Sequence, residues 1–84
     1  MSKFYGFDKF DEGETVCIAD RATLESFART WKYHHKLEAF QLDYAGREAK
    51  VLCTSMYHGG DILYELVGIP GIWHQQLLLA KKSN

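Results

Sequence analysis

The stretch that decides the fold is YHGGDILYELVGIPGIWH, residues 57–74. It contains four of the seven glycines and the only proline, in two groups on either side of an apolar run at residues 62–66. Glycine accepts the positive φ angles of tight hairpin turns, and proline presets φ at the second position of a turn. The stretch therefore predicts two successive β-hairpins, which turn at Gly59-Gly60 and at residues 68–71.

A two-residue turn at Gly59-Gly60 also predicts the pairing of the first hairpin. Residue 58 is expected opposite 61, 57 opposite 62, 55 opposite 64 and 53 opposite 66. One face of this hairpin is expected to join the core; its residues are Val51, Cys53, Ser55, Tyr57, Ile62, Tyr64 and Leu66. The other face, with Met56 and Leu63, is half apolar, so we expect a helix or the aromatic N-terminus to cover part of it.

A helix is predicted upstream of this hairpin. The alternating segment ETVCIAD, residues 14–20, predicts a short strand, and Asp20 at its end can cap a helix. Apolar residues then follow at the spacing i, i+3, i+4, i+7, namely Leu24, Phe27, Ala28 and Trp31. This stripe predicts a helix over about residues 21–35, inserted after the first strand.

The remaining segments complete a mainly β domain. REAKVLCTSMY, residues 47–57, predicts a strand, and residues 77–80 predict a closing strand after a brief turn. A chain of 84 residues forms one domain, 1–84, and we expect its tail, 81–84, to be flexible. Short strands joined by tight turns predict a closed barrel of about five antiparallel strands, because closure leaves few edges unpaired.

Three segments carry a resemblance to a known class of fold. GETVCI (13–18), YAGREAKVL (44–52) and the ending GIW–HQQLLL (71–79) resemble the strand landmarks of SH3-like small barrels, which include Tudor-like and KOW-like modules. The resemblance covers about two thirds of the chain and leaves the helix as an insertion. It implies a module that binds peptides, proteins or nucleic acid and rarely catalyses, which is an inference from fold alone.

Composition and charge narrow the classes of partner. The net charge is −1 and the basic residues form no stripe, so binding of nucleic acid ranks below binding of protein. No run of about 20 apolar residues predicts a membrane span, and the N-terminus has no apolar core of a signal peptide. Reduced cysteines and a cytoplasmic location are therefore expected. No cofactor is predicted, and self-association stays open.

Metal binding and catalysis rank third as functions. The candidate ligands are His34, His35, His58, His74, Cys17 and Cys53, and their spacing matches none of the usual close zinc-ligand pairs. Cys53 and His58 lie about 16 Å apart on an extended strand, which excludes direct contact within it. We expect buried or half-buried cysteines and surface histidines, with no metal and no catalytic residues.

Aromatic and histidine side chains near the turns suggest a binding surface. Because Trp and Tyr are favoured anchors in interfaces, Tyr44, Tyr57, His58, Trp73 and His74 are predicted to bind a protein or peptide partner. The alternative for Trp73 is that it closes the core. His58 and Asp61 are expected to pair across the turn, either to hold the hairpin or to form a pH-sensitive corner. The predicted function is a non-enzymatic interaction or adaptor domain, with a nucleic-acid-binding barrel as the alternative.

Overall fold

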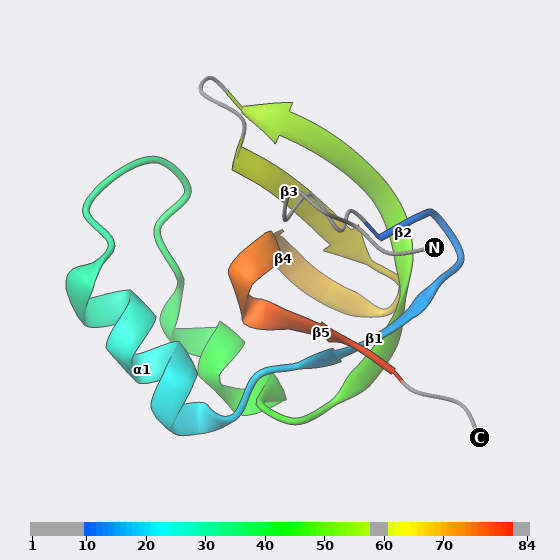
Figure 1. Cartoon of the computed structure of the whole chain (residues 1–84). Coiled ribbons are helices and arrows are strands. Elements are labelled where there is room, and N and C mark those ends of the chain that lie inside the picture. The colour runs from blue at the N-terminus through cyan, green and yellow to red at the C-terminus, as the bar shows by residue number, and fades with distance from the viewer. Residues whose placement is uncertain (1–9, 58–60, 82–84) are drawn as a thin grey trace.

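The computed structural model describes residues 10–57 and 61–81, and its strands form one sheet (Figure 1). In chain order the elements are β1 (Thr15–Ile18), the helix α1 (Arg21–Thr30), the 3₁₀ helix η1 (Ala39–Tyr44), β2 (Glu48–Tyr57), β3 (Asp61–Leu66), β4 (Ile69–His74), the 3₁₀ helix η3 (Gln75–Leu77) and β5 (Leu78–Ala80). All strand pairs are antiparallel, in the order β4-β3-β2-β1-β5. A mainly β fold with a helix inserted after the first strand is confirmed.

The sheet is open, which corrects the predicted closed barrel. β4 and β5 are its two edges, and η3 connects them without pairing them. The edge of β4 is instead covered by η1, where the Gln41 amide donates from Nε2 to the Ile72 carbonyl oxygen at 3.0 Å. The Gln41 side chain thus hydrogen-bonds a carbonyl group of β4 to which another strand could otherwise pair, and this protects the edge of the sheet.

β2 joins the two halves of the sheet and bends strongly (Figure 1). Its first residues, Glu48 to Lys50, pair with β1, and its later residues pair with β3. The register shifts between Val51 and Cys53, which marks a β-bulge, and bulges bend a strand and increase its twist. The bend wraps the sheet around a core that includes Val16, Ile18, Leu24, Phe27, Val51, Tyr64, Leu66, Trp73 and Leu77.

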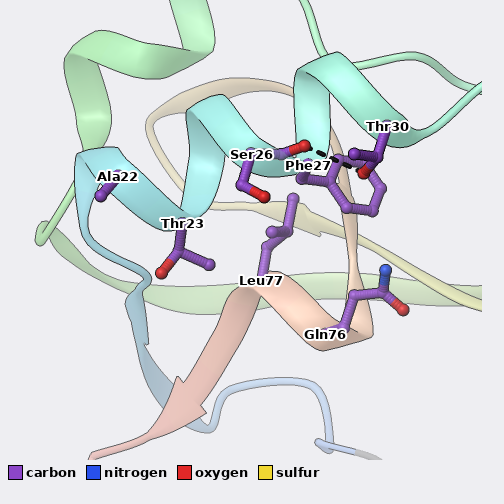
Figure 2. Close-up of a pocket in the computed structure, with 7 residues that line it drawn as sticks. All are labelled: Ala22, Thr23, Ser26, Phe27, Thr30, Gln76 and Leu77. Atoms are coloured by element: carbon purple, nitrogen blue, oxygen red, sulfur yellow. Dashed lines mark hydrogen bonds between the residues drawn. The ribbon is translucent and has the colours of Figure 1, made fainter.

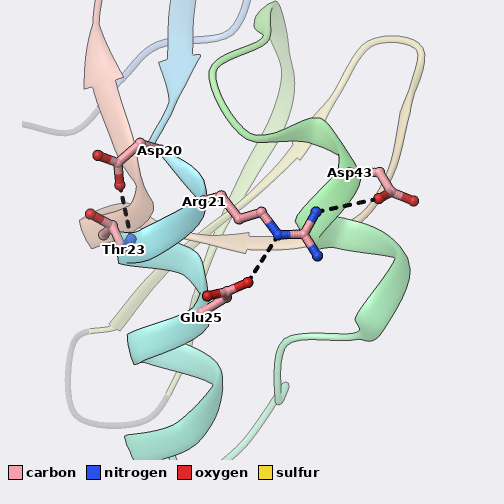
Figure 3. Close-up of polar contacts among 5 residues, drawn as sticks. All are labelled: Asp20, Arg21, Thr23, Glu25 and Asp43. Atoms are coloured by element: carbon pink, nitrogen blue, oxygen red, sulfur yellow. Dashed lines mark hydrogen bonds and ion pairs between the residues drawn. The ribbon is translucent and has the colours of Figure 1, made fainter.

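Local capping explains where α1 begins (Figure 3). The Thr23 N–H donates to the Asp20 carboxylate at 2.8 Å, as predicted for this N-cap. The Thr23 side chain, together with this backbone bond, lowers the pKa of Asp20. Arg21 contacts Glu25 at 2.9 Å and Asp43 of η1 at 3.8 Å. These ion pairs lie on the exposed side of the helix, so they link α1 to η1 only weakly.

The helix ends at Thr30, five residues before the predicted boundary. Trp31 adopts an extended conformation with φ −81° and ψ 115°, although its N–H still donates to the Phe27 carbonyl. Its indole Nε1 donates to the His34 carbonyl at 2.7 Å, and its ring stacks on Phe27 with centroids 5.0 Å apart. Side-chain contacts therefore replace further helical turns in segment 31–38, which periodicity alone cannot reveal.

The hairpin register differs from the prediction by one residue. Tyr57 lies opposite Asp61 and Thr54 opposite Tyr64, so three residues, 58–60, separate the paired positions. The predicted Gly59-Gly60 turn itself lies outside the described residues. The core face of β3 is confirmed, because Ile62, Tyr64 and Leu66 are buried.

The residues of β2 change sides as a result. Cys53 lies opposite the exposed Glu65 and is only partly buried, which corrects its assignment to the core face. Because the bulge absorbs one residue, Val51 still reaches the core.

The apolar surface of the hairpin is covered only in part. Leu63 is buried, whereas Met56 is 67 % exposed and Leu52 and Val67 are each 53 % exposed. From the aromatic N-terminus, Phe10 packs on Tyr64 with ring centroids 5.6 Å apart, and its N–H donates to the Tyr64 hydroxyl at 2.9 Å. The other N-terminal aromatic residues and the tail beyond residue 81 lie outside the described residues.

Candidate functional site

Trp73 and His74 of the predicted binding surface are both buried. Trp73 is 0 % exposed and packs in the core, where its indole Nε1 donates to the Pro70 carbonyl at 3.2 Å. His74 is 3 % exposed and, as the next residue of β4, points to the other side of the sheet. The two side chains therefore share no surface, and Trp73 closes the core.

Of the other three predicted residues, Tyr44 is the one whose side chain the structure describes. Tyr44 ends η1 half-buried, with the Arg47 guanidinium carbon 5.3 Å from its ring centroid. The backbone of Tyr57 pairs with Asp61, and its side chain, like all of His58, lies outside the described residues. A role of the five residues in binding a partner stays a prediction.

His74 lies among aromatic rings beneath segment 31–38. Its ring centroid is 4.9 Å from that of Phe27, 5.0 Å from that of Trp31 and 5.7 Å from that of His34. Its Nε2 is 2.9 Å from the His35 carbonyl oxygen. Burial lowers the pKa of His74, and the nearby imidazoles of His34 and His35 lower it further, against the opposing effects of its hydrogen bond and of Asp61.

The described histidine beside Asp61 is His34. Its Nε2 lies 2.8 Å from the Asp61 carboxylate, at the beginning of β3. Tyr57 occupies the position opposite Asp61, which differs from the predicted register, and the predicted contact of His58 with Asp61 lies outside the described residues. We call the group formed by Trp31, His34, His35, Asp61 and His74 the histidine cluster. Sequence reasoning missed it, since its members come from three separate segments.

Within residues 10–57 and 61–81, no three histidine, cysteine or acidic side chains are close enough together to hold a metal ion. Both cysteines are free thiols. Burial raises the pKa of Cys53, and the carboxylate of Glu65 raises it further, so little of this thiol is the nucleophilic thiolate.

A groove of about 420 Å³ lies between α1 and η3 (Figure 2). It is lined by Ala22, Thr23, Ser26, Phe27, Thr30, Gln76 and Leu77. Phe27 and Leu77 are buried side chains that form its base, and the hydroxyl and amide groups stand around them. We call it the α1–η3 groove. The sequence does contain a signal for this groove: Thr23, Ser26 and Thr30 follow one another at i, i+3 and i+7 and so place their hydroxyl groups on one face of α1.

A second hollow of about 260 Å³ lies beside β4. Its lining includes His35, Lys36, Phe40 and Ile72. Here Gln41 is buried; its side-chain oxygen accepts a bond from the Glu38 N–H at 2.7 Å while its Nε2 binds the edge of β4. Gln41 thus serves to dock η1, and this hollow is the narrow gap that remains beside it.

None of the helices in the described residues is long and apolar enough to cross a membrane. The chain matches no protein-family model, and no curated protein or solved structure matches it significantly. The geometry described above is therefore the basis on which a function is proposed.

Proposed function

We propose that this chain is a non-enzymatic interaction domain that binds an extended peptide segment of a partner protein in the α1–η3 groove. The observation that carries the proposal is the lining of that groove. Hydroxyl and amide groups of Thr23, Ser26 and Gln76 surround an apolar base. Such groups can bind peptide N–H and C=O groups, while the base accepts an apolar side chain.

The proposed architecture is that of an SH3-like barrel that has opened along one side. Its support is the set of five short antiparallel strands, the bend in β2 and the one-turn helix η3 before the last strand. In this arrangement α1 is an insertion that supplies one wall of the groove. The cytoplasm is the proposed location, because both cysteines are free thiols.

A peptide fits the groove better than nucleic acid does. No lysine or arginine belongs to its lining, and the whole chain has a net charge of −1. Binding of nucleic acid depends on cations that neutralise phosphates, and single strands also need exposed aromatic rings. Phe27, the aromatic residue of the lining, is buried. Nucleic-acid binding thus ranks below peptide binding.

The test is selection of peptides from a random library displayed against the full chain, followed by two matched variants. Ser26→Arg fills the groove, whereas Ala28→Arg places the same side chain on an exposed position of the same helix. We expect Ser26→Arg to weaken binding of a selected peptide at least about tenfold and Ala28→Arg to leave it unchanged. Circular dichroism checks that both variants fold.

Two outcomes contradict the proposal. One is that no peptide is selected above background. The other is that folded Ser26→Arg binds a selected peptide as tightly as the wild-type chain. Affinity that falls steeply with added salt, together with binding of an oligonucleotide, favours the nucleic-acid alternative.

A further inference from the structure

We infer that Tyr64 is a positioning residue of the α1–η3 groove, because its buried hydroxyl holds the η3 wall in place through Gln75. Tyr64 belongs to β3 and lies outside the lining of the groove, and its side chain is 1 % exposed. The inference rests on the proposed function, since it assigns a residue that sets the shape of that same site.

The two walls of the groove are anchored in different ways. α1 has ten residues, an N-cap at Asp20 and two buried side chains, Leu24 and Phe27. η3 is a single turn of three residues, and the side chain of its N-cap residue, His74, makes no capping hydrogen bond. A helix of one turn is not stable by itself, so η3 keeps its place through tertiary contacts.

Tyr64 makes a polar contact between the sheet and η3. Its hydroxyl donates to Oε1 of Gln75, the first residue of η3, and β3 and η3 lie in contact with each other. Gln76 and Leu77, the next two residues, line the groove. A contact that fixes Gln75 therefore fixes the wall that a bound peptide would meet.

Phe10, in the segment before β1, orients this hydroxyl. The Phe10 N–H donates to the Tyr64 oxygen at 2.9 Å, and the two rings pack with their centroids 5.6 Å apart. Because the oxygen accepts this bond, its own hydrogen is available to the Gln75 side chain. Bonds in such a chain polarise and strengthen one another. Phe10, Tyr64 and Gln75 thus form a hydrogen-bond relay that ends at the η3 wall.

Leu77 provides a second anchor for η3. Its side chain is 1 % exposed, and its carbonyl accepts a bond from the Ala19 N–H at 2.9 Å. Leu77 lies at the end of η3 that leads into β5, whereas Gln75 lies at the end that follows β4. Leu77 therefore fixes one end of η3, and Tyr64 fixes the other.

Tyr64→Phe tests the inference, since it removes the hydroxyl and retains the aromatic ring. The measurement is amide hydrogen exchange, followed by NMR in the absence of any peptide. The Leu78 N–H donates to the Gln75 carbonyl and so reports on η3. The Leu24 N–H donates to the Asp20 carbonyl and so reports on α1. We expect the ratio of the Leu78 to the Leu24 exchange rate to rise about fivefold, the factor that corresponds to one lost hydrogen bond.

Three further variants assign the effect to the contact itself. Tyr33→Phe is the matched control, because it removes the hydroxyl of an exposed tyrosine outside the groove, and it should leave the ratio unchanged. Gln75→Leu removes the acceptor, so it should raise the ratio as Tyr64→Phe does. If both act through one contact, the double variant should show no larger rise than either single variant.

A peptide selected for the groove gives a second readout. Its affinity should fall about fivefold in Tyr64→Phe and stay unchanged in Tyr33→Phe. If no peptide is selected, the proposed function fails, whereas the exchange ratio still measures whether Tyr64 positions η3.

The inference is overturned if folded Tyr64→Phe keeps the wild-type exchange ratio, or if the effects of the two single variants add in the double variant. It is also overturned if a selected peptide binds Tyr64→Phe as tightly as the wild-type chain. Should Tyr64→Phe fail to fold, Gln75→Leu decides in its place, and an unchanged ratio in that variant rules out the contact as an anchor of η3.

Discussion

Trp73 and His74 are consecutive residues of β4, both buried, yet they lie in two different interiors. Trp73 is enclosed by apolar side chains of the sheet and α1, and its one polar atom donates to Pro70 nearby. His74 is enclosed by aromatic rings and by polar atoms of segment 31–38. The first interior consists of apolar and aromatic side chains, with Tyr64 among them, whereas the second contains imidazole groups.

The difference shows how this domain separates stability from sensitivity to its surroundings. Apolar burial supplies most of the stabilisation of a small domain and does not vary with pH. Contacts through imidazole vary with pH near neutrality. The contribution of the apolar core to stability should therefore stay constant with pH, whereas the contribution of His74 should change with it.

The largest expected effect is that of Trp73→Ala. Removal of a fully buried aromatic side chain should reduce the free energy of unfolding by about 3–5 kcal/mol. This is a large part of the stability of a domain of 84 residues. Urea denaturation measures it, with the exposed Val67→Ala as control. A midpoint equal to that of the control would show that Trp73 is not the centre of the core.

The next effect concerns the side of β4 that η1 covers. Gly71 has φ +100°, and a Cβ added there would lie 2.8 Å from Nε2 of Gln41. Gly71→Ala should therefore cost about 2–4 kcal/mol, from backbone strain and overpacking together.

Gly68→Ala is the matched control for this change. Its φ is +76°, but an added Cβ meets nothing within 4 Å, so only the strain of about 1–2 kcal/mol remains. Urea denaturation midpoints measure the loss of stability in each variant, and we expect the larger loss for Gly71→Ala. Equal losses would show that Gln41 does not dock tightly against Gly71.

A smaller effect is the pH dependence contributed by His74. Its pKa is lowered in the folded state by burial, so the unfolded chain binds the proton more readily. This contribution is fully present above the ordinary histidine value of about 6.5 and is lost as pH falls below it, with a slope of at most about 1.4 kcal/mol per pH unit. Urea titrations from pH 8 to pH 5 measure the slope. His74→Gln should reduce it, and an unchanged slope would assign the dependence to other groups.

The smallest effect is expected on the exposed side of α1. Arg21→Ala removes the ion pairs with Glu25 and Asp43, and the arginine side chain is 57 % exposed. Solvent screens such pairs, so the loss should not exceed about 1 kcal/mol. Thermal melting at low and high salt measures it. A loss comparable to that of Gly71→Ala would mean that the ion pairs, and not Gln41, hold η1 in place.

Several features of the fold followed from the sequence because they depend on neighbouring residues. The N-cap at Asp20, the burial of Leu24 and Phe27 on α1 and the burial of Ile62, Tyr64 and Leu66 follow from local patterns. Ala28, predicted as part of the apolar stripe, is exposed. The positive φ of Gly68 agrees with a tight turn in the second hairpin. That turn lies at residues 67 and 68, between the paired Leu66 and Ile69, and not at residues 68–71 as predicted, so Pro70 and Gly71 belong to β4. Each of these features is settled within one or two turns of backbone.

Only the tertiary structure decided the rest, since it depends on residues distant in sequence. The bulge in β2 and the one-residue change of register reflect how the sheet bends around its core, which no turn motif encodes. The early end of α1 results from Trp31 finding partners in His34 and His74. Trp73 and His74 thus lie in different interiors because one face of β4 packs on the core and the other packs on segment 31–38. These partners are distant in sequence and come together only in the folded chain.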